Sequence, residues 1–360
     1  MLVLPKIHRS RPDRSQQQLA LLFLLLIPVM SQAENYSAQK LSANGIDIVR
    51  LKDSAHKTEV SIAPSLGNNA YEMKVNGTAI LWSPYENVGE LAAKPVQCGN
   101  PFLEPWANRI DQDAFWANGK KYLLNPDLHN YRYDPNHKPI HGLVVWAKDW
   151  KVIATHADSH SASVTSRLEF WRHPDWMAQF PFAHTIEMTY RLAGGVLEVR
   201  TAIENLSTAP MPLVIGFHTY YQIPGVARDT WKVHLPAREH VELSKVLIPT
   251  GQAKPMELSD PLPLVGTQLD DVFTGLERGG GGRAAFSVNG GGRKISVLYG
   301  PKYPVAVVYA PPGKEYICFE PMTGLTNGFN LAHAGLYKDL QSIPAGGIWT
   351  ESFWIEPSGF

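Results

Sequence analysis

The sequence lacks the features that mark several classes of protein. It has 33 Lys+Arg against 33 Asp+Glu, and this balance argues against a nucleic-acid binder that relies on a basic face. Two cysteines in 360 residues cannot build a disulfide scaffold. Hydrophobic residues make up 44% of the chain, which is too much for a disordered protein. The composition therefore indicates a folded globular protein.

Long apolar runs are also missing, except for one near the N-terminus. A stretch with four basic residues, 1–18, precedes an apolar run at 19–30, and Ser31-Gln32-Ala33 offers small residues at the −3 and −1 positions of a cleavage site. A basic stretch, a short apolar run and a small-x-small site form a secretory signal peptide. We therefore expect residues 1–33 to direct export to the periplasm or the medium. An uncleaved N-terminal anchor is the alternative.

Removal of the signal peptide changes the charge of the working protein. Residues 1–33 hold four basic residues and one acid, so 29 basic and 32 acidic residues remain, a net charge of −3. No later segment reaches 18 apolar residues without a charge, so we expect no membrane anchor after cleavage. In an oxidising compartment Cys98 and Cys318 either pair or remain two buried free thiols, and the sequence leaves both open.

The remaining chain is patterned for strands. Apolar and polar residues alternate at every second position, as in residues 186–192 and 197–203, which indicates strands with one buried face. Turn signals separate such segments, among them Ala193-Gly194-Gly195 and the four glycines 279–282, which we expect at hairpin tips. No long 3.6-residue periodicity follows the signal peptide. The pattern predicts an all-β fold, a large sandwich or barrel, with residues 34–360 as one domain.

Four segments combine polar groups with Gly, Pro and aromatic residues in a way that a plain β core does not require: residues 99–110, 139–143, 216–224 and 318–322. A single arginine or histidine in such a segment has an ordinary structural explanation as a salt-bridged or hydrogen-bonded residue. Glu320 is different, because it lies in an apolar strand that stops at a proline. A carboxylate there needs partners or a raised pKa, which makes Glu320 a candidate general base.

The sequence contains no motif that indicates a metal site or a catalytic nucleophile. His137 and His141 have the i, i+4 spacing of a helical metal pair, but Pro135 and Pro139 argue against a helix there. No cluster of Cys and His completes a zinc set, and no G-x-S-x-G motif is present. The sequence therefore predicts no metal site.

Taken together, the segments resemble those of a known family. Gly99-Asn-Pro-Phe-Leu, Trp106-Ala-Asn-Arg-Ile110, Asn118-Gly-Lys-Lys-Tyr-Leu123 and Ile140-His-Gly-Leu143 resemble, in that order and rough spacing, the aldose 1-epimerases, or galactose mutarotases. The second histidine motif, the aspartate segment and the glutamate segment of that family have counterparts in Gly216-Phe-His-Thr-Tyr-Tyr221, Leu269-Asp-Asp-Val-Phe273 and Phe319-Glu-Pro321 followed by Asn330. The resemblance runs from about residue 40 to the C-terminus.

The resemblance implies a fold and an activity. The fold is a large antiparallel β-supersandwich of the galactose mutarotase type, and the reaction interconverts the α and β anomers of free aldohexoses without a cofactor. Glu320 would take the proton of the anomeric hydroxyl as general base. His218 would protonate the ring oxygen as general acid, so that the ring opens, rotates and closes on its other face. These residue types suit a reaction that moves only protons.

The resemblance also implies a set of binding residues and a sugar partner. Arg109, His141, Asp270 and Asn108 would hold the hydroxyls of a glucose- or galactose-like monosaccharide, and the neighbouring Asp271 remains an alternative to Asp270. Among aromatic residues, Trp106 and Tyr220 are candidates to stack on a sugar face. We expect a monomer or a dimer.

The sequence departs from the family pattern, most clearly at Glu104, which stands where an apolar or aromatic residue is expected. Two other functions remain: a non-catalytic carbohydrate-binding protein on the same fold, and a hexose-6-phosphate 1-epimerase. The latter needs a basic pocket, to which Arg228, Lys232 or Arg283 would contribute. The presence of both a candidate base and a candidate acid favours catalysis, and the net charge of −3 favours a neutral sugar.

Overall fold

The computed structural model describes residues 1–4 and 35–360, and most of the regular secondary structure within these is antiparallel strand. Residues 34–360 form one compact unit. The all-β, single-domain prediction is therefore confirmed. The predicted signal peptide lies, apart from its first four residues, outside the described residues. None of the described helices is long and apolar enough to cross a membrane.

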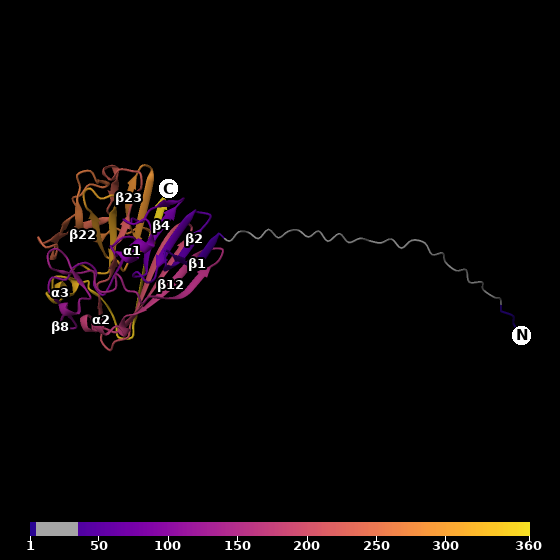
Figure 1. The fold of residues 1–360 in the computed structure, drawn as a ribbon, viewed down its shortest axis with the longest axis horizontal. Coiled ribbons are helices and arrows are strands. Elements are labelled where there is room, and N and C mark those ends of the chain that lie inside the picture. Colours follow the sequence, from indigo (N-terminus) through magenta and orange to yellow (C-terminus); the bar gives the residue numbers. More distant parts are fainter. Residues whose placement is uncertain (5–34) are drawn as a thin grey trace. The chain divides into compact units, whose positions relative to one another are not determined.

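Two large sheets make up most of the fold (Figure 1). The nine-stranded sheet has the order β11 (Lys151–Ala157), β12 (Ala162–Glu169), β13 (His184–Ala193), β14 (Val196–Asn205), β28 (Ile348–Ser358), β24 (Arg293–Tyr299), β23 (Ala284–Gly290), β18 (Lys232–His234), β21 (Leu262–Pro263). The eight-stranded sheet has the order β20 (Pro249–Pro255), β19 (Ala237–Leu243), β22 (Leu269–Leu276), β25 (Val305–Ala310), β26 (Ile317–Met322), β16 (Gly216–Phe217), β6 (Phe102–Leu103), with β17 (Thr219–Tyr221) also paired to β26.

A five-stranded meander lies beside β11 and β12 at one side of the molecule (Figure 1). It consists of β1 (Tyr36–Ala43), β2 (Ile46–Asp53), β3 (Thr58–Ala63), β4 (Asn69–Val75) and β5 (Thr78–Ala79). Three small two-stranded sheets pair β7 (Ala114–Ala117) with β8 (Lys120–Leu123), β9 (Arg132–Tyr133) with β10 (Pro139–Ile140), and β15 (Met211–Leu213) with β27 (Gln341–Ile343). The described helices are short: α1 (Val88–Ala93), α2 (Pro174–Gln179) and α3 (Gly328–His333).

The two large sheets bury their apolar faces against each other. Along β13 buried residues alternate with half-buried or exposed ones, as the sequence predicted, and the buried apolar residues join the main core. Across the sandwich, Phe217 of β16 meets Phe353 of β28 with ring centroids 4.8 Å apart. Burial of such rings removes apolar surface from water at about 25 cal/mol per Å², which is the main force that holds the sheets together.

The eight-stranded sheet is apolar on both faces, and this places the candidate residues. In β26, Ile317 and Phe319 point into the main core, while Cys318, Glu320 and Met322 belong to the opposite face. Successive residues of a strand point to opposite faces, so the alternation follows from β geometry. Glu320 therefore projects from the face of the sheet that does not pack on the nine-stranded sheet.

One of the two predicted hairpins is present, and the two cysteines do not pair. The predicted strands 186–192 and 197–203 are β13 and β14, joined by a hairpin at Gly194–Gly195. The hairpin predicted at 279–282 is wrong, because this segment connects β22 of one sheet to β23 of the other. Cys98 and Cys318 are both buried and free.

One close backbone contact fixes the loop that follows β10. Gly142 pairs with Glu104 through an isolated bridge and has a φ of +68°. A Cβ atom on Gly142 would lie 2.1 Å from the carbonyl oxygen of Glu104. Only glycine fits here, since it has no Cβ and adopts positive φ freely. The contact sets the position of the adjacent His141.

We expect Gly142→Ala to destabilise the protein by roughly 3 kcal/mol, because the strain of positive φ adds to a backbone clash. Gly119→Ala is the matched control: its φ is +73°, but nothing lies within 4 Å of the added Cβ. The control should lose only about 1 kcal/mol. Urea unfolding of both variants gives the comparison, and equal losses would show that the contact with Glu104 is unimportant.

Candidate functional site

A cavity of about 440 Å³ opens on the outer face of the eight-stranded sheet. Hereafter it is the site cavity. Strand β26 supplies its floor, and the segments around β9, β10 and residues 108–109 supply its walls. All six residues proposed from the sequence line it: Glu320, His218, Arg109, His141, Asp270 and Asn108. Residues more than 200 positions apart in the sequence thus meet in one place.

Strand register brings the proposed acid and base together. Gly216 pairs with Met322 and Thr219 pairs with Phe319, so the register places His218 directly opposite Glu320 on the same face. Nε2 of His218 lies 3.2 Å from Oε1 of Glu320. Cross-strand neighbours of this kind have adjacent Cβ atoms and interact directly.

Burial controls the protonation of this pair. It lowers the pKa of His218 to about 3, with help from the positive charges of Arg132 and Arg109. It also raises the pKa of Glu320 well above its ordinary value, and the charge of Asp270 raises it further, while Arg109 opposes the shift. Both shifts favour uncharged forms. Between the two pKa values the pair therefore holds one proton, which rests on Glu320.

Arg109 is held rigidly at the edge of the site cavity. Its Nε donates to Oδ2 of Asp134 at 2.7 Å, and its Nη1 donates to the side-chain oxygen of Asn108 at 2.9 Å. Side chains of Arg109 and Asp134 are only 11% and 2% exposed. Burial alone would raise the pKa of Asp134, but hydrogen bonds from Arg109 and from the backbone of Lys138 outweigh it and lower that pKa.

The two neighbouring aspartates have different surroundings. Asp270 lines the site cavity, and its Oδ2 lies 3.8 Å from Nη2 of Arg109. Burial raises the pKa of Asp270, although Arg109 opposes this. Asp271 does not line the site cavity, and its Oδ1 is paired with Nε2 of His240 at 2.7 Å. The geometry thus favours Asp270 as a ligand group.

His141 faces His218 across the site cavity, with ring centroids 5.3 Å apart and planes at 85°. Its backbone is left-handed, with a φ of 66°, and its N–H donates to the carbonyl of Asn108 at 2.9 Å. Burial lowers the pKa of His141 well below its ordinary value, and the nearby His218, Arg132 and Arg109 act in the same direction. A neutral imidazole here serves as donor and acceptor rather than as a charge.

Several buried polar atoms of the site have no protein partner. They are Nδ1 of His141, Nδ1 of His218 and Oε2 of Glu320. Buried polar groups are nearly always hydrogen-bonded, so a cluster of unpaired ones calls for a polar ligand. A sugar, which carries hydroxyls on most of its carbons, supplies donors and acceptors at this density.

The aromatic candidates divide into one that lines the site and one that does not. Tyr220 lines the cavity and stacks on His218, with ring centroids 4.7 Å apart. Trp106 is only 1% exposed, belongs to the main core and does not line the cavity, so its proposed stacking on a sugar is wrong. The Trp106 ring packs in the core instead, as large aromatic side chains commonly do.

The structure adds residues that the sequence analysis missed. Asp134 holds Arg109, and Arg132 lines the cavity and donates to the side chain of Gln97. The only signal for Asp134 was its place in Asp-Pro-Asn, where an aspartate commonly accepts from the backbone of the next residues. Its carboxylate does accept from the backbone of Asn136. The contact with Arg109 spans 25 residues and leaves no local trace.

Glu104, the clearest departure from the family pattern, lies in the interior. Its Oε1 is 2.7 Å from Nε2 of His184, and both side chains are at most 2% exposed. A buried carboxylate needs such a partner.

Among the described residues, no group of three or more His, Cys, Asp and Glu side chains has the arrangement of a metal site. The carboxyl group of Glu320 and the imidazole of His218 are instead placed to exchange protons with the oxygen atoms of a bound ligand.

A family model described as aldose 1-epimerase matches residues 47–356. The chain belongs to the aldose 1-epimerase family. Solved structures show the same fold. A galactose mutarotase-like protein from Clostridium acetobutylicum is 20% identical, covers 91% of this chain and 100% of its own, and has a TM-score of 0.80. Galactose 1-epimerase from Lactobacillus acidophilus NCFM is 13% identical, with 91% and 99% covered and a TM-score of 0.69.

A third structure agrees with these. A protein titled putative aldose 1-epimerase from Escherichia coli K12 is 16% identical, covers 90% of this chain and 99% of its own, and has a TM-score of 0.64. At these identities the match is one of fold, which is the galactose mutarotase-type sandwich that the resemblance implied.

We expect His218 to stay neutral as the pH falls through the ordinary histidine range, because its pKa is lowered to about 3. NMR of protein with ¹³C-labelled histidine side chains measures this titration, and loss of one signal in His218→Gln assigns it. At pH 5 the signal should still be that of the neutral ring. A midpoint above pH 5 would contradict a neutral pair.

Proposed function

We propose that this protein is an isomerase that interconverts the α and β anomers of free aldohexoses, with Glu320 as general base and His218 as general acid. The observation that carries the proposal is the buried pair itself, with oxygen and nitrogen 3.2 Å apart and with pKa values that burial shifts toward the uncharged forms of both groups. Membership of the aldose 1-epimerase family supports the same reaction class.

In the proposed reaction, the anomeric hydroxyl gives its proton to the Glu320 carboxylate while the protonated His218 gives one to the ring oxygen. The bond between C1 and the ring oxygen breaks, and C1 becomes an aldehyde. Rotation about C1–C2 presents the other face, and the reverse transfers close the ring. The pair holds one proton before and after, so the proton count balances.

The electrostatics of the site favour ring opening. The reactive arrangement, carboxylate and imidazolium, has the same total charge as the resting arrangement, in which both groups are neutral. Because burial disfavours both charged forms, proton transfer to the open sugar returns the pair to the arrangement that the site stabilises. The same preference has to be overcome when the reactive arrangement forms and when the ring closes, so it assists the opening transfer alone.

Binding of the sugar would use the polar wall. Arg109, Asn108, His141 and Asp270 line the same cavity and present donors and acceptors for hydroxyls. Since Asp134 fixes the Arg109 guanidinium by a 2.7 Å hydrogen bond, little side-chain freedom remains to be lost on binding. This preorganisation favours a ligand of defined stereochemistry, and a monosaccharide fits the cavity volume of about 440 Å³.

The two alternatives have less support. A binding module has no use for an acid and a base held in contact with opposed pKa shifts. The cations proposed for a phosphate pocket are elsewhere: Arg228 is buried and donates to backbone carbonyls, and Arg283 lies over the Trp354 ring at 3.5 Å. None of the three, Lys232 included, lines the site cavity. We also propose that the protein works outside the cytoplasm, on the basis of its N-terminal sequence.

We expect Glu320→Gln to abolish catalysis, because the amide keeps the shape of the side chain but cannot take a proton. A general base contributes about 10²- to 10⁴-fold to a rate. Polarimetry of freshly dissolved α-D-glucose and α-D-galactose measures the effect. Wild-type protein should equilibrate at least one sugar faster than buffer. If it equilibrates neither, or if Glu320→Gln equals wild type, the proposal is wrong.

A matched pair of variants separates the two aspartates. Asp270→Asn should lower kcat/KM by roughly 10- to 100-fold, the worth of one hydrogen bond to a charged group. Asp271→Asn should change it by less than about threefold, because Asp271 faces His240 instead of the site cavity. Saturation-transfer NMR of the anomeric protons measures both, and a larger loss in Asp271→Asn would reverse the assignment.

A further inference from the structure

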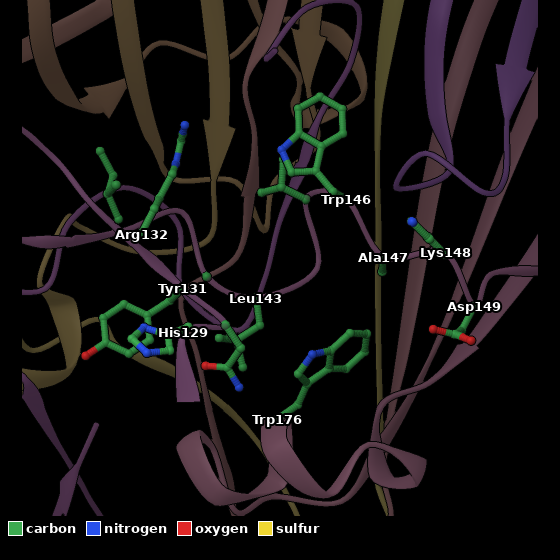
Figure 2. A pocket seen from close by; sticks show the side chains of 13 residues that line it. His129, Tyr131, Arg132, Leu143, Trp146, Ala147, Lys148, Asp149 and Trp176 are labelled. Atoms are coloured by element: carbon green, nitrogen blue, oxygen red, sulfur yellow. The ribbon is translucent and has the colours of Figure 1, made fainter. Parts of the chain in front are cut away.

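Two further cavities share wall residues with the site cavity and take no part in the proposed chemistry. One has a volume of about 420 Å³, shares Arg132 with the site cavity and has Trp146 and Trp176 in its wall (Figure 2). The other has a volume of about 570 Å³ and lies beyond Asp270. Hereafter it is the polar cavity, lined by residues 240–244, Leu247, Thr250, Lys254, Asp270 and Asp271. The wall between it and the site cavity determines how closely water approaches the proposed acid and base.

The polar cavity is open to solvent. The side chain of Lys254 is 70% exposed, and its Nζ lies 2.6 Å from Oε1 of Glu242. His240 and Asp271, which are paired with each other, are also partly exposed. Charged and polar groups at the surface remain hydrated, so water reaches the wall that the polar cavity shares with the site cavity.

This shared wall consists of two residues. Among the described residues, only Asp270 and Leu247 line both the site cavity and the polar cavity. The carboxyl group of Asp270 binds water and does not exclude it. Leu247 is therefore the only apolar side chain in the wall.

Leu247 reaches the wall because a hairpin loop folds over the sheet. It lies between β19 and β20, whereas Glu320 lies in β26, and two strands, β22 and β25, separate β19 from β26. Neighbouring strands are about 4.8 Å apart, so β19 itself is roughly 14 Å from β26. The loop must therefore fold over the outer face of the sheet for Leu247 to line a cavity that has β26 as its floor.

The loop is fixed in this position. The Leu247 N–H donates to the carbonyl of Ser244 at 2.9 Å, and the Ser244 N–H donates to the carbonyl of Ile248 at 2.8 Å. Ile248 and Pro249 are buried at its base, and Leu243 packs against an apolar cluster of the sheet. Leu247 is therefore a permanent part of the wall.

The backbone of Leu247 has a conformation that leucine rarely adopts. Its φ is 60°, in the left-handed region, where Cβ crowds the following carbonyl oxygen. Among the described residues, nine of the eleven non-glycine residues with positive φ are Asn or His, which tolerate this region, and the other two are Lys57 and Leu247. Turn chemistry favours Gly or Asn at such a position. A leucine that is kept there against this preference indicates that its side chain serves the site.

The groups next to this wall depend on dry surroundings. Burial is the largest cause of both the low pKa of His218 and the raised pKa of Glu320. The charged and titratable groups that face His218 are Glu320, Tyr220, Tyr309, His141, Arg132 and Arg109. All of them remain in a variant at position 247, so a change in the titration of His218 in that variant reports the entry of water.

We propose that Leu247 is the apolar barrier that keeps the water of the polar cavity away from Glu320 and His218, and that the strain of its backbone is retained for this role. Leu247 is thus a positioning residue, which acts through the protonation of the pair and not through contact with the reacting atoms. The inference rests on the proposed function only for its effect on turnover, because the exclusion of water is measured on His218 itself.

Leu247→Asn tests the barrier, because asparagine suits the left-handed backbone but is polar and admits water. In NMR of protein with ¹³C-labelled histidine side chains, the titration midpoint of His218 should rise from about 3 in wild type to above about 5, toward the ordinary histidine value. Urea unfolding shows whether the variant is folded.

The pH profile of turnover should change in the same direction. Below the pKa of His218 the pair holds two protons, and Glu320 can then take none from the sugar. With α-D-glucose or α-D-galactose, kcat/KM of wild type should stay constant from about pH 7 to pH 4, whereas kcat/KM of Leu247→Asn should fall about tenfold over this range. A residue that only stabilises the fold would not move this limb of the profile.

Two variants serve as controls. Leu247→Met keeps an apolar side chain in the wall, so it should keep the low midpoint of His218 and the wild-type pH profile. Lys57→Asn relieves the same kind of backbone strain in the turn between β2 and β3, where Lys57 has a φ of 47°, is exposed and does not line the site cavity. It should change neither measurement.

Four results would show that the inference is wrong: an unchanged midpoint of His218 in Leu247→Asn, an equal rise in Leu247→Met or in Lys57→Asn, loss of the native fold in Leu247→Asn, or a wild-type midpoint that is already above about 5. If wild type turns over neither sugar but the midpoint still rises only in Leu247→Asn, the barrier stands and the epimerase proposal falls. If wild type turns over a sugar and the midpoint does not move, the barrier falls alone.

Discussion

The register between β26 and the segment that runs from β16 into β17 places two titratable side chains in the same dry location. A histidine and a glutamate in contact in water would form an ion pair, because their ordinary pKa values differ in the direction that charges both. Burial reverses that order, with the pKa of His218 at about 3 and that of Glu320 raised. The rest of the site is organised around this neutral pair, which remains ready to exchange its proton with a bound hydroxyl.

Around the pair, the walls of the site are made from loops that are themselves fixed. Arg109 is tied to Asp134, Asn108 is tied to Arg109, and the backbone of His141 is tied to Asn108. Each of these groups faces the cavity, and each is held by a neighbour in the same set. The tight packing of Gly142 on Glu104 anchors the set to the core. Binding groups on loops are thereby given the precision that strands give to Glu320 and His218.

The sequence alone predicted much of this and missed specific parts of it for physical reasons. Strands such as β13 and β14 follow from alternation, which is a local property. The contribution of Asp134 depends on a contact with Arg109 across 25 residues, and no local pattern encodes it. The four-glycine segment 279–282 connects a strand of one sheet to a strand of the other. A run of glycines suits such a connection as well as the turn of a hairpin, so composition alone does not separate the two. Trp106 lay in the right motif but faced the core. The six proposed residues were named together because their motifs resembled those of a family, and the structure places all six around one cavity.

The position of Glu320 within the fold has a consequence for how such a protein changes over time. β26 is an inner strand, with β25 on one side and β16 and β17 on the other. Inner strands open last during local unfolding, whereas loops open early and tolerate insertions. The proposed proton-transfer groups therefore lie on inner strands, while Arg132 and the other wall residues lie on loops and short strands that tolerate change. The fold thus separates the groups of the proposed reaction from those of the proposed sugar binding, so residues that contact the sugar can change without disturbing the proposed acid and base.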